Sequence, residues 1–334
     1  MISDKLLEQI DKRKNPCSVG LDPDVEKMPE FLFKGNSSRH VADAFIEFNH
    51  AIIDAVADLV PVVKPQIAFY EAYGEEGVWA FKNTVDYARE QELCVIEDGK
   101  RNDIGNTARK YAQGHLGCVN LSGEWQPSLD LDLLTVNPFL GSDCLKPFVE
   151  ECEKYSKGIF VLVKTSNPSS GEYQDRLVKL NENESRALEK LGIECSDCME
   201  LYHLAALQVN EYAQKLKGER GYSPIGAVVG ATYPQQAEVL RKIMPDSFFL
   251  VPGYGAQGGS ADDIVACFND DGCGAVINSS RNINYAFSML KDDAGELLYK
   301  PSQFAEASRH AAKIMIDDVC SALEKAGKVP QTML

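Results

Sequence analysis

The sequence is short of basic residues relative to acidic ones, and it has no long apolar run. Its 334 residues include 34 lysines and arginines against 50 aspartates and glutamates, a formal net charge of −16. Binding to a nucleic-acid backbone needs a basic face, so we expect no nucleic-acid partner. No stretch of about 18 apolar residues occurs, so we expect no membrane-spanning helix. The opening segment, MISDKLLEQIDKRKN, is typical of an amphipathic helix and not of a signal peptide.

Histidines are also few, and no cysteine or histidine cluster has the spacing of zinc ligands. The five histidines stand at positions 40, 50, 115, 203 and 310, and none closes a predicted strand. Their placement argues against a histidine base and against a Ser-His-Asp triad. Cys195 and Cys198 form one C-x-x-C pair, but no second pair completes a zinc site. We therefore expect no metal ion.

What is present is the composition of a globular protein, with 44% hydrophobic and 25% charged residues. Several of the ten cysteines lie in apolar runs such as LCVIED and DIVACF. Reduced, buried thiols have this setting, which favours a cytoplasmic location.

Eight short, nearly continuous apolar runs alternate with segments of helical character. Such runs are typical of parallel strands covered on both faces. Apolar residues recur at helical spacing over 41–59 and 301–323, and Ser37 and Ser38 are candidate N-caps of the first helix. Length alone also allows two domains, but eight alternating units predict an α/β fold, a single (β/α)8 TIM barrel over residues 1–334. The runs are Cys17–Leu21, Val60–Lys64, Leu93–Asp98, Leu131–Asn137, Gly158–Lys164, Ile225–Gly230, Phe248–Pro252 and Gly274–Asn278.

Two regions are longer than a minimal barrel requires. Residues 181–220 predict an additional helical insert before strand six, and residues 114–130 predict a loop before strand four. No linker divides the chain.

Polar side chains close most of the apolar runs. The carboxyl ends of barrel strands open on one mouth, so six loops would bring donors, acceptors and charges to one place. These residues are Asp22, Lys64, Asp98 with Lys100, Thr165 with Ser166, Gln257, and Arg281.

The segment EDGKRNDIGNTA, residues 97–108, is the richest in charge. Side chains alternate along a strand, so Asp98 and Lys100 should point the same way, with Asp103 on the outgoing loop. An ammonium flanked by carboxylates stays protonated, which suits Lys100 to proton donation and not to Schiff-base formation. With Lys64 it would form a row of alternating charges. The alternative is a solvated loop with ion pairs.

Two further segments predict a monophosphate site. PGYGAQGGS, residues 252–260, has the G-x-G-x-x-G spacing of a dinucleotide site, but the next strand ends without the acidic residue that binds a ribose. A glycine-rich loop close to a phosphate is therefore favoured, and a flexible turn with Ser260 as a helix cap is the alternative. INSSRNINY, residues 277–285, places Arg281 after strand eight, where barrels often bind phosphate.

The segment VKTSNPSSGEY, residues 163–173, follows strand five. Thr165, Ser166 and Asn167 could hydrogen-bond a polar ring, and the Ser/Gly/Pro tail is typical of a mobile lid. An ordinary loop is the alternative.

At these residues the chain resembles the orotidine 5′-phosphate decarboxylase family, over nearly its whole length. SVGLDPD, VKPQIAFYEAYG, EDGKRNDIGNTA, VKTSNP, PGYGAQGG and INSSR all match in order. The last two resemble the branch that includes bacterial and apicomplexan enzymes. The resemblance implies a (β/α)8 barrel, a homodimer with shared active sites, and no metal or organic cofactor.

The resemblance also implies catalytic roles. Lys64, Asp98 and Lys100 match the charged array of one subunit. Asp103 matches the carboxylate that reaches the neighbouring site across the dimer interface. The residues that would accompany it there are Ile104 and Thr107.

Ligand contacts are implied in the same way. Asp22 and Lys64 match contacts to ribose hydroxyls, and Thr165 and Ser166 match the pair that contacts the pyrimidine. Pro252 would line the pocket. The matches to phosphate contacts are Gln257, Arg281 and the amide of Ser280.

The implied reaction converts orotidine 5′-monophosphate to uridine 5′-monophosphate (UMP) and CO2, the last step of de novo UMP biosynthesis, with Lys100 as proton donor to C6. Related sugar-phosphate decarboxylases and hexulose-phosphate synthases use Mg²⁺, held by a carboxylate at the end of strand two. Here that place is Lys64, and the place of their strand-five histidine is Thr165. A non-catalytic nucleotide-binding barrel and an NAD-dependent oxidoreductase are two further hypotheses. The chain has no phosphoribosyl-pyrophosphate motif of its own, so orotate phosphoribosyltransferase, which makes the substrate, is a candidate partner.

Overall fold

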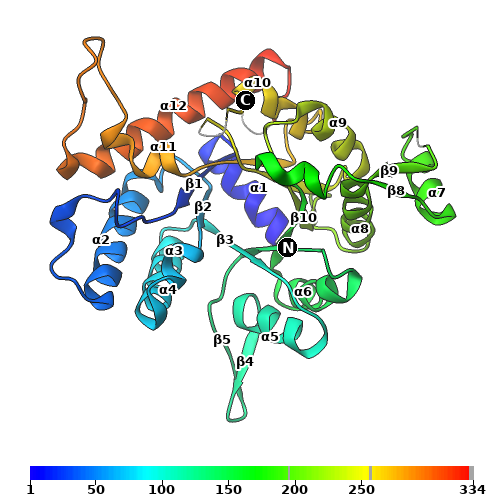
Figure 1. Ribbon diagram of the computed structural model, residues 1–334, viewed down its shortest axis with the longest axis horizontal. Coiled ribbons are helices and arrows are strands. Elements are labelled where there is room, and N and C mark those ends of the chain that lie inside the picture. Colours follow the sequence, from blue (N-terminus) through cyan, green and yellow to red (C-terminus); the bar gives the residue numbers. More distant parts are fainter. Residues whose placement is uncertain (195, 256–257, 331–334) are drawn as a thin grey trace.

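The computed structural model describes residues 1–194, 196–255 and 258–330. Eight parallel strands close into a barrel in the order β1-β12-β11-β10-β7-β6-β3-β2 (Figure 1). Each of the eight predicted runs contributes one strand, so the predicted TIM barrel is confirmed. The strands are β1 (Cys17–Leu21), β2 (Val62–Pro65), β3 (Cys94–Arg101), β6 (Leu133–Val136), β7 (Gly158–Lys164), β10 (Ser223–Val229), β11 (Ser247–Val251) and β12 (Ala275–Ser279).

Helices between the strands surround the barrel (Figure 1). The first long helix, α2 (Ser38–Val56), begins three residues before residue 41, where the apolar stripe that predicted it starts. The Ser37 hydroxyl accepts a hydrogen bond from the His40 amide, which caps the helix and starts it at Ser38. The longer helices are α2 (Ser38–Val56), α4 (Gly74–Glu90), α5 (Gly105–His115), α6 (Ser142–Tyr155), α8 (Leu201–Lys215), α9 (Pro234–Ile243) and α12 (Phe304–Lys325). The short ones are α3 (Ala68–Glu71), α10 (Ala261–Ile264), α11 (Arg281–Asn284), η1 (Glu30–Leu32), η2 (Pro168–Glu172), η3 (Val265–Cys267), η4 (Ala286–Ser288) and η5 (Pro301–Gln303).

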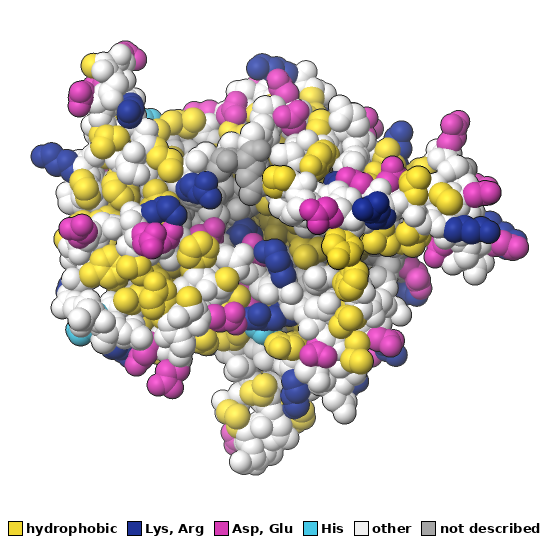
Figure 2. Space-filling model, viewed as in Figure 1, with side chains coloured by type: hydrophobic (Ala, Val, Ile, Leu, Met, Phe, Trp, Pro, Cys, Tyr) yellow, Lys and Arg dark blue, Asp and Glu magenta, His cyan; other side chains and the backbone are white. Residues whose placement is uncertain are grey.

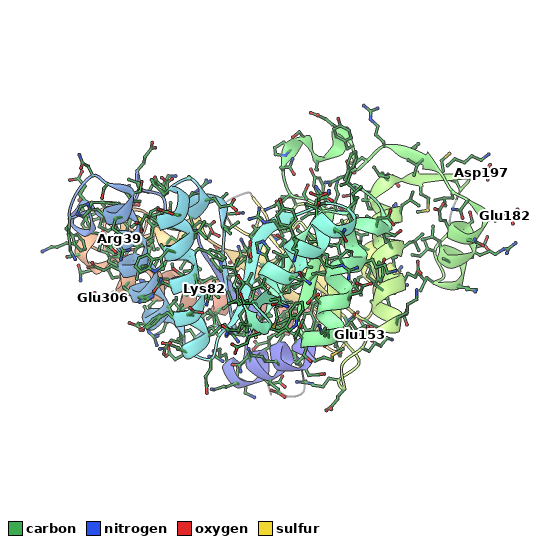
Figure 3. All side chains as sticks on the ribbon, turned by 90° about the horizontal axis from the view of Figure 1, so that it is seen from below. Arg39, Lys82, Glu153, Glu182, Asp197 and Glu306 are labelled. Atoms are coloured by element: carbon green, nitrogen blue, oxygen red, sulfur yellow. The ribbon has the colours of Figure 1, made fainter. Side chains whose placement is uncertain are left out.

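The amino-terminal helix closes one end of the barrel. The apolar face of α1 (Ile2–Arg13) carries Leu6 and Leu7, which pack in one cluster with the inward-facing Ile96 and Phe160. Lys5 forms an ion pair with Asp132, just before β6, at 3.0 Å. Figure 3 shows α1 below the strands, so the open mouth lies at their carboxyl ends. The predicted amphipathic helix is therefore confirmed, as the floor of the barrel.

Two predicted connections differ from the structure. Residues 114–130 contain a hairpin of β4 (Cys118–Leu121) and β5 (Glu124–Pro127), not only a loop. The 181–220 region is not a single helical insert. Its first helix, α7 (Glu182–Lys190), belongs to an excursion with a small antiparallel pair at the edge of Figure 1. Its second, α8, packs on β7 and β10 and is the ordinary barrel helix before strand six. The small pair is β8 (Leu177–Lys179) and β9 (Cys198–Glu200).

The nine cysteines that the structure describes are free thiols. Burial raises the pKa of the Cys94 thiol to about 12, so it is an unreactive core side chain. Cys195 lies outside the described residues. Within the described ranges, no helix is both long and apolar enough to cross a membrane. In the same part of the chain, no three His, Cys, Asp or Glu side chains gather as a metal site requires.

Candidate active site

A continuous charged array lies at the mouth, on the exits of β2 and β3. Asp98 bridges two lysines, with Oδ2 2.9 Å from Lys64 Nζ and Oδ1 2.5 Å from Lys100 Nζ. Lys64 is only 4% exposed, whereas Lys100 reaches toward the open side. Figure 2 looks onto this mouth and shows basic side chains gathered near its centre. The predicted row of alternating charges is therefore present for these three residues.

Burial and ion pairing act in opposite directions on the pKa values of this array. Burial alone would raise the pKa of Asp98, but attraction to Lys64 and Lys100 outweighs burial and holds the pKa well below its usual range. For Lys64, burial favours the neutral amine, but Asp98 and Asp22 raise the pKa above its ordinary value. Asp98 is therefore a carboxylate and Lys64 an ammonium at neutral pH.

Replacing Asp98 by asparagine is expected to lower stability at neutral pH. The buried Lys64 ammonium loses its closest carboxylate, and removing one partner of a buried ion pair typically costs about 3–5 kcal/mol. Because the folded-state pKa of Asp98 is lowered, its stabilisation is present above the unfolded value of about 3.9 and is lost as pH falls toward the folded value. Thermal unfolding should therefore show a lower Tm for Asp98→Asn at pH 7 and a smaller gap in strong acid. Equal Tm values at pH 7 would contradict this ion pair.

The strand that carries the array is distorted where it leaves the barrel. Lys100 has a φ of 47°, and the register of β3 against β6 shifts between Glu97 and Arg101. A lysine in the left-handed region persists only when its surroundings fix it. The Lys100 amide donates to Thr135 Oγ1 at 2.9 Å, and the Thr135 hydroxyl donates to Asp98 Oδ1 at 3.1 Å. Simple strand alternation thus predicted the right neighbours for a backbone that is not regular.

Thr135 was missed by the sequence reasoning, although a signal existed. It lies two residues after the inward-facing Leu133, so strand periodicity places it on the inner side at the end of its run.

A second set of missed residues holds β3 from the outer side. The wholly buried Glu97 pairs with His115 Nδ1 at 2.6 Å, and Arg101 pairs with Glu71 at 2.5 Å. These contacts fix the strand segment on both sides of Asp98 and Lys100.

The structure does not bring Asp103 to the array of its own chain. Asp103 Oδ1 accepts a hydrogen bond from the Ile104 amide at 2.8 Å. Among the described residues, no hydrogen bond or ion pair joins Asp103 to Lys100. Ile104 is 54% exposed, and Thr107 is also exposed on the first turn of α5. Asp103 is half-buried beside the exposed Ile104, and its service to the site of a second copy stays a prediction.

Asp22 and Ser280 meet at the exits of β1 and β12. The Ser280 hydroxyl interacts with the Asp22 carboxyl, and burial raises the pKa of Asp22 against the opposing pull of Lys64. Gly20 allows this approach, because a Cβ there would lie 1.8 Å from Ser280 Oγ. Arg281 follows Ser280 and is exposed at the mouth. The array, Asp22 and Ser280 therefore form one connected polar site.

The remaining predicted contacts lie on other loops of the same mouth. The Thr165 hydroxyl donates to Asn167 at 2.7 Å and accepts from Gln174 at 2.9 Å. Ser166 is half-buried beside Gly230. The loop they begin is held by an ion pair between the wholly buried Lys164 and Asp175. Both hydroxyl residues thus lie on an anchored loop, and the structure does not place them in contact with the charged array.

The glycine-rich segment follows β11 as predicted. The Pro252 carbonyl accepts a hydrogen bond from the Ala231 amide at 3.0 Å, which joins the exits of β11 and β10. Ser260 caps the short helix α10 in a reciprocal pair with Asp263, so the predicted cap is confirmed, whereas phosphate binding by this loop stays a prediction. Gln257, the predicted phosphate contact of this loop, lies outside the described residues.

Known proteins share this arrangement over most of the chain. A family model described as Orotidine 5'-phosphate decarboxylase / HUMPS family matches residues 18–287. A Rhodopirellula baltica protein named orotidine 5'-phosphate decarboxylase is 46% identical over 284 residues, which cover 83% of this chain and 87% of that protein. One of the same name from Caldicellulosiruptor bescii is 37% identical over 327 residues, covering 96% and 98%.

A solved structure agrees with these sequence relatives. Leishmania donovani OMP decarboxylase superposes with a TM-score of 0.67 at 25% identity, covering 96% of this chain and 98% of that chain. The matches in sequence and in fold both extend across the barrel strands that carry the site. The chain therefore belongs to the orotidine 5'-phosphate decarboxylase / HUMPS family.

Proposed function

We propose that the protein is a carboxy-lyase that converts orotidine 5′-monophosphate to UMP and CO2 without a metal or organic cofactor. The observation that carries this proposal is the Lys64–Asp98–Lys100 array at the barrel mouth. Close relatives of the whole chain bear the name of this activity. The reaction is the last step of UMP biosynthesis, and the whole chain would serve it as one catalytic barrel. Five described cysteines are buried free thiols, which supports a reducing, cytoplasmic setting.

The chemical problem is a carbanion with no route for delocalisation into the ring. When the bond from C6 to the carboxyl carbon breaks, CO2 leaves and the electron pair stays on C6. The Lys100 ammonium would stabilise that charge and transfer one proton to C6, and the neutral amine would then regain a proton from water. Asp98 holds Lys100 Nζ at 2.5 Å, so the donor is oriented before the substrate arrives. Its negative charge would also repel the substrate carboxylate, and loss of CO2 relieves that repulsion.

Asp103 of a second copy would complete the site. Ile104 and Thr107 would enter the neighbouring mouth with it, and this arrangement makes the enzyme a homodimer with shared active sites. The exposed Ile104 side chain supports this, because an apolar side chain beside a carboxylate at the mouth gains from burial against a partner. Orotate phosphoribosyltransferase, the enzyme that makes the substrate, is proposed as a further partner.

The nucleotide would be held by separate groups for each of its parts. Asp22 and Lys64 would bind ribose hydroxyls, Thr165 and Ser166 would bind the pyrimidine, and Pro252 would line the pocket. Phosphate would bind at Ser280, Arg281 and Gln257. The phosphate is remote from C6, so its binding energy can be used to close the loops and order the charged array.

Arg281→Ala is expected to weaken UMP binding. A guanidinium bonded to a phosphate contributes a charge-assisted hydrogen bond of about 1.5–3 kcal/mol, which corresponds to a loss of roughly tenfold to a hundredfold in affinity. Isothermal titration calorimetry with UMP measures this directly. Uridine, which has no phosphate, should bind the variant and the wild type alike. Unchanged UMP affinity would show that Arg281 does not bind the phosphate.

A Mg²⁺-dependent reaction on a sugar phosphate is the second candidate, because the family name covers more than one activity. Its relatives need a carboxylate at the end of strand two. Here that position is Lys64, whose ammonium is already paired with Asp98 at 2.9 Å and has no lone pair for a cation. Decarboxylation of orotidine 5′-monophosphate that persists in EDTA separates the two candidates. Activity that appears only with Mg²⁺ and a sugar phosphate would favour the second.

A further inference from the structure

Two side chains that follow β12 hold the main chain of Asp22. Asn284 is fully buried, and Tyr285 is 3% exposed. The Asp22 amide donates to Asn284 Oδ1 at 3.0 Å, and the Tyr285 hydroxyl donates to the Asp22 carbonyl at 2.7 Å. Both hydrogen-bonding groups of the Asp22 main chain are therefore engaged by this one pair of residues.

The same pair also fixes the residues on either side of Asp22. Asn284 Nδ2 donates to the Gly20 carbonyl at 2.6 Å, and the Asp24 amide donates to the Tyr285 hydroxyl at 2.7 Å. Four hydrogen bonds thus join residues 20–24 to residues 284–285. The strand ladder ends at Leu21, so the chain beyond it depends on these side chains for its path.

The Tyr285 side chain belongs to the main hydrophobic core cluster of the protein. The Tyr285 ring stacks on Phe48 of α2, with ring centroids 6.1 Å apart, so the ring lies between the strands and the surrounding helices. Only its hydroxyl reaches the Asp22 main chain. The Asp22 main chain is therefore held by hydrogen bonds on the outer side, while the Asp22 carboxyl faces inward.

The Asp22 carboxyl is the group that benefits from these hydrogen bonds. Its Oδ1 atom is buried and has no hydrogen-bond partner among the described residues. A buried carboxylate oxygen without a donor is costly, and a ligand hydroxyl can supply that donor. A small change in the path of residues 20–24 would move this oxygen away from a bound hydroxyl.

We propose that Asn284 and Tyr285 are positioning residues, which hold the Asp22 carboxyl in place for the ribose hydroxyls of the nucleotide. They lie in the same short segment as Ser280 and Arg281, so they also fix the distance between the ribose-binding and phosphate-binding residues. This inference rests on the proposed function, because it takes the ligand to be a ribonucleotide. It adds two residues that touch no substrate to the groups on which substrate binding depends.

The test uses Tyr285→Phe and two ligands that differ only in the ribose. UMP carries both hydroxyls, and 2′,3′-dideoxyuridine 5′-monophosphate carries neither. Titration calorimetry should show UMP binding weakened about tenfold in the variant, the loss of one well-placed hydrogen bond to a charged group. Binding of the dideoxy ligand should stay within about twofold of wild type. The preference for UMP should therefore fall, which a general loss of stability would not produce.

Two more variants complete the test. Tyr87→Phe is the matched control, because the Tyr87 hydroxyl bonds Asp54 at 2.5 Å on outer helices, and it should leave both affinities unchanged. Asn284→Ala should reproduce the selective loss of UMP affinity. Equal weakening of both ligands, unchanged UMP affinity, or loss of folding in both Tyr285→Phe and Asn284→Ala would overturn the positioning role. A wild-type protein that does not prefer UMP over the dideoxy ligand would instead overturn the ribose-binding part of the proposed function.

Discussion

Lys100→Ala is expected to abolish decarboxylation while the protein still binds UMP. In the proposed mechanism, the substitution removes both the cation that would face the developing carbanion and the proton that C6 would receive. Positioned proton transfer contributes about 10²–10⁴-fold, and a preorganised charge contributes about 10²–10³-fold, so the combined loss should be of the order of 10⁴-fold or more. Lys100 is the exposed end of the array, so the fold should survive its loss. The decrease in orotate absorbance measures turnover, and calorimetry with UMP measures binding.

The control for that substitution is Lys82→Ala. Lys82 is labelled in Figure 3, lies on α4 outside the barrel and forms an ion pair with Asp86. It carries the same charge and also has one carboxylate partner, but it is not at the mouth. Its replacement should leave turnover near wild type. Near-normal turnover of Lys100→Ala would show that another group protonates C6, and loss of UMP binding would show that Lys100 serves binding instead.

Asp103→Asn is expected to lower turnover by about 10²–10³-fold, although Asp103 makes no contact with Lys100 in its own chain. The proposed reason is that its carboxylate serves the site of the second copy. A mixture of Lys100→Ala and Asp103→Asn chains tests this. In a mixed dimer, one site carries both substitutions and the other carries neither. Random mixing should therefore recover about a quarter of wild-type activity from two nearly inactive proteins.

The opposite result, no recovery of activity on mixing, would show that the site is not shared. If Asp103 acts within its own chain, every site in the mixture contains one substitution, and mixing adds nothing to the activity of the separate variants. Exchange of subunits should be followed with two different affinity tags, so that the mixed dimer is isolated before its activity is measured. A pure mixed dimer without activity would contradict the shared site.

The barrel could be predicted from the sequence because its strands are buried on both faces. Such strands are continuous apolar runs, and Cys17–Leu21 and Gly158–Lys164 were found with their correct ends. The hairpin over 118–127 could not be found in this way. Its residues are largely exposed, so burial imposes no apolar pattern on it. The sequence also does not show that α1 closes one end of the barrel. An amphipathic pattern indicates that one face of a helix is buried, but not which element covers that face.

Part of the candidate site could be predicted because local strand geometry fixes it, and the rest depends on contacts between distant segments. Asp98 and Lys100 are two residues apart, so strand geometry is enough to bring them together. Thr135 on β6 accepts a hydrogen bond from the Lys100 amide, and Asn284 on α11 accepts one from the Asp22 amide. Each contact joins segments far apart in sequence. Neither contact follows from local spacing, because it depends on strand order and on the register of neighbouring strands. The left-handed backbone of Lys100, whose amide donates to Thr135, likewise depends on the surrounding structure and not on its own residue type.

The most direct test of the central claim is the ultraviolet absorbance of orotidine 5′-monophosphate mixed with the purified protein in EDTA. The account predicts that the orotate chromophore disappears and that UMP forms in equal amount, because Lys100 and its carboxylates supply the whole chemistry of the step. An unchanged spectrum in EDTA, with activity restored by Mg²⁺ or found only on a sugar phosphate, would contradict it.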